Sequence, residues 1–343
     1  MAEPSDDIPL GRLRGYVSAV VGCAPERIGA ATRFEEGNRH AVYQVSYAGA
    51  DGALEQVVVR VSYGHQPQDR AQAGREAAVL EAVAGTAAPR LYDFSPSGPW
   101  FDTPTMCMQF VDGHPIELSS ARPDEIRALG STLAWVHGRP AVGLADRGLE
   151  AGDLVSYAEG RLESILHRLA WVRDPLPSPV QTGLRRIADS LRAGWEPARR
   201  SAGFLTGEPL VLLHGDVGPG NVLWCPDPVL IDWEYSRLGD PADEIAYLFD
   251  QNGLSADQRE VFWTGYRTGS EQPELFHHVA ARVDWWLPVT LLGSALWWVE
   301  RWVRRIGADG TGEVDPEVPR SPDYYLQRVL ERLHRVERPQ ARP

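Results

Sequence analysis

Hydrophobic and polar residues follow two different periods along this chain, and the change divides it into two parts. In residues 28–63, the stretches "AVYQVSYAG" and "LEQVVVRVSYG" alternate with a period of two around the turn signal "GADGA", which predicts a β-hairpin. Two more strands are predicted from "PRLYDFSPSG" and "DTPTMCMQFVDGHP", the second of which ends at the turn signal Asp112-Gly113. Helical spacing in residues 8–23 and 69–84 predicts two helices beside this sheet.

Helical periodicity dominates the rest of the chain. The segments with apolar residues at intervals of three and four are 123–137, 153–172, 178–200 and a final series from "DPADEIAYLF" to about residue 336. Only "PLVLLHG" and "PVLIDW" predict short strands there, and Asp240 or Asp243 is expected to cap the helix that follows them. We therefore predict an α+β fold of two lobes. An N-terminal antiparallel β-sheet lobe occupies residues 1–113, and a larger, mainly α-helical lobe occupies residues 114–343.

The formal net charge of −13 narrows the range of partners. Nonspecific binding to nucleic acid requires a basic surface that displaces counterions from phosphates, so no nucleic-acid partner is expected. A cationic small molecule is favoured, although an acidic surface also keeps a protein soluble without any further role. The three cysteines share no CxxC spacing, which argues against a disulfide framework and against a zinc site.

No segment of the sequence predicts a membrane partner. The N-terminus, "MAEPSDDIPLG", lacks the basic start and apolar core of a secretory signal. The most apolar stretch, "WWLPVTLLGSALWWV" at residues 285–299, contains Pro288 and is shorter than the about 20 residues that a bilayer span requires. We therefore predict a buried helix there and a cytoplasmic protein, and we leave the oligomeric state open.

The chemistry-bearing residues concentrate around the two short strands of the second lobe. "HGDVGPGN" has the form H-x-D-x-x-x-x-N, and a second aspartate, in "LIDWE", follows the first by sixteen residues. Phosphoryl transfer needs a carboxylate that accepts the proton of the attacking hydroxyl, and Mg²⁺ held by hard oxygen ligands between the phosphates. Asp216 fits the first role, and Asn221 and Asp232 fit the second. His214 is expected to brace the loop, while Glu234 is expected either near a second Mg²⁺ or in a hydrogen bond to nearby backbone.

With these motifs in this order, the chain resembles the aminoglycoside phosphotransferase and choline kinase group, whose fold is similar to that of protein kinases. The resemblance covers about residues 30–330. It implies that ATP or GTP is the co-substrate, together with Mg²⁺. It also implies that the first lobe binds the nucleotide and that the second holds the catalytic residues and the acceptor. "EEGNRHAVYQV" resembles the loop whose main-chain N–H groups reach the phosphates, which implies a nucleotide-binding role for Gly37 and Asn38.

Further landmarks of this family fall in the first lobe. "VVVRV" occupies the strand that usually carries a lysine, and "GREAAVL" occupies the helix that offers its glutamate partner, so the resemblance pairs Arg60 with Glu76. A guanidinium in place of the ammonium can still clamp phosphate oxygens, in a different geometry. "MCMQFVDG" resembles the hinge, where main chain from Gln109 to Val111 hydrogen-bonds to adenine. Because "HGD" and "DWE" differ from the "HRD" and "DFG" of protein kinases, and no "APE" segment follows, the resemblance implies a small-molecule kinase.

Tryptophan is concentrated near the end of the second lobe. Five of the twelve tryptophans fall within 18 residues, namely Trp285, Trp286, Trp297, Trp298 and Trp302. Two interpretations are open. The rings either pack in the core, or they line an acceptor pocket in which aromatic faces attract ammonium groups beside Asp284 and Glu300.

The resemblance and the charge together predict transfer of the γ-phosphoryl group from ATP or GTP to a hydroxyl of a small, cationic acceptor. An aminoglycoside-like antibiotic, and with it a role in antibiotic resistance, ranks ahead of choline-like and other metabolic amino alcohols. The alternative from another class is a nucleotide-binding relative without catalysis. Asp216, Asn221 and Asp232 are all present, so Arg60 is the residue that leaves this alternative open.

Overall fold

Five antiparallel strands form the sheet of the N-terminal lobe, in the spatial order β1-β2-β3-β5-β4. The strands are β1 (Ile28–Arg33), β2 (His40–Ala48), β3 (Leu54–Ser62), β4 (Leu91–Ser95) and β5 (Thr105–Gln109). The predicted hairpin is formed by β2 and β3, and β1 extends it on one side. Arg60 pairs with Val42 of β2 and with Met106 of β5, so it lies in the middle of the sheet.

A helix covers each face of this sheet. Val57, Val59 and Val61 of β3 pack in one core with residues of α1 (Leu10–Val21). Because side chains alternate across a strand, Arg60 points to the opposite face. There it meets Glu76 of α2 (Pro67–Val83), whose apolar residues belong to the large core that continues into the second lobe.

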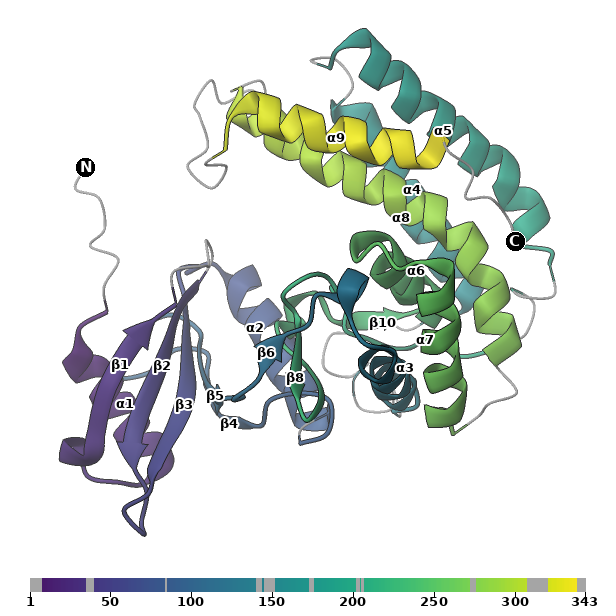
Figure 1. Ribbon diagram of the computed structural model, residues 1–343. Coiled ribbons are helices and arrows are strands. Elements are labelled where there is room, and N and C mark those ends of the chain that lie inside the picture. The colour runs from purple at the N-terminus through teal and green to yellow at the C-terminus, as the bar shows by residue number, and fades with distance from the viewer. Residues whose placement is uncertain are drawn as a thin grey trace.

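The second lobe is mainly helical and occupies the teal, green and yellow part of Figure 1. Its α-helices are α3 (Pro123–His137), α4 (Leu154–Val172), α5 (Ser178–Ala198), α6 (Pro241–Gln251), α7 (Ala256–Gly269), α8 (Phe276–Arg305) and α9 (Pro322–Glu337). Its strands are β6 (His114–Pro115), β7 (Val211–Leu213), β8 (Val222–Cys225), β9 (Asp227–Leu230) and β10 (Arg237–Gly239). The 3₁₀ turns of the molecule include η1 (Pro25–Arg27), η2 (Leu118–Ser120) and η4 (Trp233–Tyr235). Strands β6, β8 and β9 form one small sheet, and β7 pairs with β10.

Three local details decide how the second lobe presents its polar residues. Asp240, and not Asp243, caps α6, because its carboxylate accepts a hydrogen bond of 2.9 Å from the Ala242 N–H. The strand predicted from "PVLIDW" ends at Leu230, so Asp232 lies beyond it. Strand β8, which the sequence pattern does not predict, pairs with β9 as a tight hairpin.

The predicted buried helix lies within α8. Val289, Leu292 and Leu296 are all buried there. No helix in the described part of the chain is long and apolar enough to cross a membrane. The three cysteines are free thiols.

The computed structural model describes residues 8–34, 40–83, 85–139, 144, 152–172, 176–201, 204, 207–271, 276–306 and 320–337. Gly37 and Asn38 lie outside these ranges.

Candidate active site

The loop between β7 and β8 holds Asp216, and a buried histidine fixes its shape. His214 is fully buried, and its Nδ1 accepts a hydrogen bond of 3.2 Å from the Asp216 N–H. Its Nε2 donates to the carbonyl oxygen of Ile231 at 2.9 Å, and its ring packs on Trp233 with 4.5 Å between the ring centroids. These contacts join the Asp216 loop to the segment that carries Asp232, as expected of a brace.

The hairpin of β8 and β9 places Asn221 opposite the residue that precedes Asp232. The Ile231 N–H donates to the carbonyl oxygen of Asn221 at 3.0 Å, so the residue before Asp232 lies opposite Asn221. Asn221 Nδ2 donates to the carbonyl oxygen and to Oδ2 of Asp216, at 2.9 and 3.1 Å. Its Oδ1 has no hydrogen-bond partner among the described residues, so the amide presents its oxygen as a potential ligand.

Asp232 has a left-handed backbone, with φ 65° and ψ 68°. It is the one non-glycine residue with positive φ in the described ranges. This conformation costs a non-glycine residue about 1–3 kcal/mol and is concentrated at functional sites, where the surrounding structure enforces it. The neighbours are fixed here, since the Trp233 indole donates to the carbonyl oxygen of Leu230 at 2.9 Å.

Arg60 links the two lobes at this site. Its guanidinium forms a hydrogen-bonded ion pair with Glu76, and its Nη1 lies 3.5 Å from Oδ1 of Asp232. Burial alone would lower the pKa of Arg60, but the charge and hydrogen bond of Glu76, followed by the charge of Asp232, raise it above its ordinary value. The cation is therefore held between a carboxylate of the first lobe and the predicted metal ligand of the second.

In the predicted hinge between the lobes, the main-chain N–H of Val111 is available to a ligand, whereas that of Gln109 already donates a hydrogen bond. The Gln109 N–H already donates to the carbonyl oxygen of Arg90 at 2.8 Å, and its Oε1 accepts from the Arg90 N–H at 3.2 Å. The Val111 carbonyl oxygen accepts from the Gly113 N–H at 2.9 Å, while the Val111 N–H has no partner within the described residues. The roles of these residues, and of Gly37 and Asn38 outside the described ranges, stay predictions.

The residues expected to bind the metal supply oxygen atoms alone. The described residues contain no group of three or more His, Cys, Asp or Glu side chains that could hold a metal ion. Two protein ligands are nevertheless sufficient for Mg²⁺ in a kinase, because this ion keeps several water molecules and binds the phosphates of the nucleotide. The amide oxygen of Asn221 and the carboxylate of Asp232 therefore fit Mg²⁺ better than a softer ion.

Tyr247 on α6 contacts Asp216 directly, although no sequence pattern singles it out. Its hydroxyl donates to Oδ1 of Asp216 at 2.5 Å. Burial, followed by the charge of Asp216, raises the pKa of Tyr247, so the phenol keeps its proton at neutral pH. Each carboxylate oxygen of Asp216 thus has a donor, from Tyr247 or from Asn221, and each retains a lone pair for an acceptor hydroxyl.

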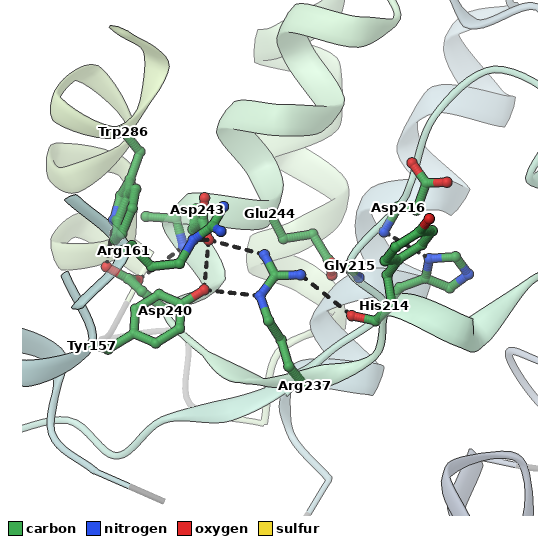
Figure 2. A network of polar contacts seen from close by, with 12 residues as sticks. Tyr157, Arg161, His214, Gly215, Asp216, Arg237, Asp240, Asp243, Glu244 and Trp286 are labelled. Carbon is green, nitrogen blue, oxygen red and sulfur yellow. Dashed lines mark hydrogen bonds and ion pairs between the residues drawn. The ribbon is translucent and has the colours of Figure 1, made fainter. Parts of the chain in front are cut away.

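A second residue of α6, Glu244, supports the predicted catalytic loop, which joins β7 to β8 and holds Asp216 (Figure 2). Its Oε1 accepts a hydrogen bond of 2.6 Å from the Gly215 N–H. Its Oε2 lies 2.9 Å from Nε2 of His137. Burial alone would raise the pKa of Glu244, but the hydrogen bond and charge of His137 outweigh it, with smaller contributions from His214 and the Gly215 N–H. The pKa therefore lies below its ordinary value, and a charged carboxylate anchors the residue before Asp216.

An ion-pair network lies beside this contact and joins α4, β10 and α6 (Figure 2). Oδ2 of Asp243 accepts hydrogen bonds from the Tyr157 hydroxyl at 2.6 Å and from Nη2 of Arg237 at 3.0 Å. Nε of Arg161 lies 3.3 Å from the same oxygen. A Cβ at Gly215 would lie 2.6 Å from Nη1 of Arg237, so the network abuts the catalytic loop.

The first two tryptophans of α8 serve packing. Trp286 is fully buried, and its indole donates to Oδ2 of Asp240 at 2.8 Å. The ring of Trp285 packs between its neighbours, with 4.9 Å between its centroid and that of Trp195. The core-packing interpretation therefore accounts for this pair.

The surroundings of Trp297 and Glu300 differ from those expected of an acceptor pocket that attracts ammonium groups. Glu300 forms a bidentate ion pair with Arg168, at 2.7 and 3.0 Å, so its charge is already compensated. Trp297 is 38% exposed, and the guanidinium of Arg301 lies over its ring. The chain itself therefore supplies the cation at this aromatic face.

The two lobes bring together a predicted carboxylate base, two predicted oxygen ligands and a buried cation, which is the set of groups that phosphoryl transfer requires. The class defined by this combination is the small-molecule kinases. Comparison with known families agrees. The model of the phosphotransferase enzyme family matches residues 30–276, and the chain belongs to this family.

Three known proteins are similar to this chain. The thiamine kinase of Escherichia coli O81 (strain ED1a) is 30% identical over 200 residues, which cover 52% of this chain and 69% of that protein. Choline kinase from Cryptosporidium parvum Iowa II has a TM-score of 0.59 at 14% identity, with 95% of this chain and 96% of that chain covered. A spectinomycin phosphotransferase in complex with ADP and spectinomycin has a TM-score of 0.59 at 12% identity, with coverage of 90% and 94%. At these identities, the two structures establish the fold.

Proposed function

We propose that this phosphotransferase carries the γ-phosphoryl group of ATP or GTP to a hydroxyl of a small molecule, with Asp216 as the general base. The observation that carries the proposal is that Asn221 contacts both Asp216 and the residue before Asp232. Arg60 lies 3.5 Å from Asp232 at the same place. The ADP bound to the spectinomycin phosphotransferase supports a nucleotide as the donor.

In this reaction the acceptor hydroxyl gives its proton to Asp216 while its oxygen bonds to the γ-phosphorus. The bond between the γ-phosphorus and the β,γ-bridging oxygen breaks, and the nucleoside diphosphate leaves. Asn221 and Asp232 would hold Mg²⁺, which neutralises phosphate charge when bound. Arg60, aligned by Glu76, binds a phosphate oxygen and keeps the nucleotide against this edge of the site.

The first acceptors to test are hydroxyl compounds that carry an amine, among them aminoglycosides and choline-like alcohols. The net charge of −13 favours a cationic acceptor. Thiamine and choline, which the names of two similar proteins designate as substrates, each carry a quaternary nitrogen. If the protein were instead a nucleotide-binding relative without catalytic activity, it would bind Mg·ATP and phosphorylate no acceptor.

Asp216→Asn tests the role of the base. The wild-type protein is incubated with Mg·ATP and a panel of hydroxylated amines, and ADP release and phosphorylated product are measured together. We expect Asp216→Asn to lower kcat by about 10²- to 10⁴-fold, because the proton acceptor is lost, while the Kd for Mg·ATP stays unchanged.

Asp227→Asn is the matched control, because it changes an exposed carboxylate at the start of β9 in the same hairpin, and it should retain full activity. Activity that survives Asp216→Asn would refute the role of this residue. A wild-type protein that neither binds nucleotide nor turns over any acceptor would refute the kinase assignment.

A further inference from the structure

Arg301 on α8 is a half-buried cation that has no carboxylate partner among the described residues. Its guanidinium carbon lies 3.1 Å from the centroid of the Trp297 ring, and it forms no hydrogen bond or ion pair with any residue in the described ranges. The buried arginines Arg60 and Arg282 differ, because each contacts at least one carboxylate. Burial lowers the pKa of Arg301 below its ordinary value.

The face of α8 that carries Arg301 looks toward the catalytic loop. Ser294, Trp297 and Arg301 are spaced at i, i+3 and i+7, which places them on one side of the helix. Ser294 Oγ accepts a hydrogen bond of 3.2 Å from Nε2 of Gln251 on α6. Gln251 lies one turn after the tyrosine that holds Asp216, so this side of α8 faces the same region as the catalytic base.

Tyr235, in η4, lies three residues after Asp232 and is one of the groups near Arg301, together with Arg304, Glu300 and Tyr325. A Cβ at Gly215 would lie 2.1 Å from the carbonyl oxygen of Tyr235, so Tyr235 packs against the residue that precedes Asp216. The seven-residue step from Ser294 to Arg301 corresponds to about 10 Å along the helix.

We propose that Arg301, supported by Trp297, binds an acidic group of the acceptor, a carboxylate or a phosphate, while the acceptor hydroxyl lies at Asp216. This inference rests on the proposed phosphotransferase function. A guanidinium stacked on an aromatic ring keeps its N–H donors at its edge, where a planar carboxylate or a phosphate accepts two of them. No hydrogen-bond acceptor for these donors lies among the described residues, and the acidic group of the substrate supplies one.

The position of Arg301 near the end of α8 does not explain its environment. Cations near a helix C-terminus interact favourably with the helix dipole, which accounts for the exposed Arg304 one turn further on. That interaction with the helix dipole requires neither the partial burial of Arg301 nor its contact with the Trp297 ring. The acceptor is therefore a hydroxyl compound that carries an acidic group in addition to any amine.

The test compares acceptors that differ in the acidic group alone. Glycerate and glycerol 3-phosphate are compared with glycerol, and homoserine is compared with 3-amino-1-propanol, each with Mg·ATP and the wild-type protein. We expect kcat/KM for at least one acidic compound to exceed that of its neutral or basic counterpart by at least about tenfold. The comparison of glycerate with glycerol 3-phosphate shows whether the acidic group is a carboxylate or a phosphate. Arg301→Gln should raise KM for the preferred acid by about ten- to a hundredfold and leave kcat/KM for its counterpart unchanged.

Arg304→Gln is the matched control, because it removes the same charge from the same helix, and it should keep the preference. The inference would be overturned if the wild-type protein preferred the counterparts without an acidic group. It would also be overturned if the preference for the acid persisted in Arg301→Gln. Either result would leave the proposed function intact. Arg301→Lys, which keeps the charge without the planar fork, should retain part of the preference, and circular dichroism of each variant checks that it is folded.

A binding measurement covers the case in which Mg·ATP binds but no member of the panel is phosphorylated. In the presence of Mg·ADP, an acidic member should raise the Tm of the wild-type protein and not that of Arg301→Gln. The absence of such a shift overturns the inference. Failure of the wild-type protein to bind Mg·ATP at all counts against the proposed function instead.

Discussion

Two glycines of the catalytic loop share a left-handed backbone and differ in their surroundings. Gly215 has φ 89° and Gly220 has φ 91°. A Cβ on Gly215 would lie 2.1 Å from the carbonyl oxygen of Tyr235, whereas a Cβ on Gly220 would meet nothing within 4 Å. The close approach allows the Gly215 N–H to reach Glu244, and this contact sets the position of Asp216.

We expect Gly215→Ala to reduce the free energy of unfolding by more than Gly220→Ala does. Both variants carry the cost of about 1–3 kcal/mol for a side chain in the left-handed region. Gly215→Ala alone adds a collision with the backbone of Tyr235, which must be relieved by moving η4 or the loop after β7. Urea unfolding of both variants and of the wild-type protein measures the difference, and equal losses would contradict this explanation.

At the scale of elements, α6 ties the catalytic loop to the helical lobe. Asp240 begins the helix as its cap and also binds Arg282 of α8. Glu244, one turn later, holds Gly215, and Tyr247 holds Asp216 itself. One helix therefore positions the predicted base through two successive turns.

Glu244→Gln should make stability depend less on pH. The substitution weakens the hydrogen bonds to His137 and to the Gly215 N–H, so we expect a loss of about 1–3 kcal/mol at pH 7. Because the folded-state pKa of Glu244 lies below its ordinary value of 4.5, the stabilisation is present above pH 4.5 and is lost as the pH falls through the folded-state pKa. The difference in free energy of unfolding between wild type and variant should therefore shrink in acid.

Urea titrations at several pH values from neutral to acid measure this difference. Glu260→Gln, an exposed position on α7, serves as the control and should show little difference at any pH. A difference for Glu244→Gln that stays constant into acid would show that its charge does not contribute.

At the scale of the whole molecule, the protein is acidic, but a buried cation lies where its two lobes meet. The formal net charge is −13, and Arg60 is the cation at the predicted phosphate site. Arg60 also joins the lobes, because it contacts Glu76 of α2 and lies 3.5 Å from Asp232.

Arg60→Gln should weaken nucleotide binding. The loss of a charge-assisted contact to a phosphate, about 1.5–3 kcal/mol, corresponds to an increase of about ten- to a hundredfold in the Kd for Mg·ATP. Isothermal titration calorimetry measures this Kd. Arg70→Gln, an exposed position on α2, is the control and should leave the Kd unchanged, and similar effects of the two substitutions would argue against a phosphate-binding role for Arg60.

Local periodicity predicted most of the fold. The helix predicted at residues 123–137 is α3 as observed, and the hairpin and the other helices of the described ranges agree within a few residues. These elements are local consequences of which positions are apolar. Strand β8 escaped prediction because it is short and gains its pairing from β9 and β6. The division of the lobes at Gly113 stays a prediction.

The sequence by itself determined which residue types were available to the site, since Asp216, Asn221 and Asp232 lie within one short segment whose spacing is typical of phosphoryl transfer. The contacts that orient these residues were decided by tertiary structure. Tyr247 and Glu244 reach the loop from a helix about 30 residues away. Hydrogen bonds and ion pairs between distant segments have no period in the sequence, because the packing of α6 and α8 around a common core brings their partners together.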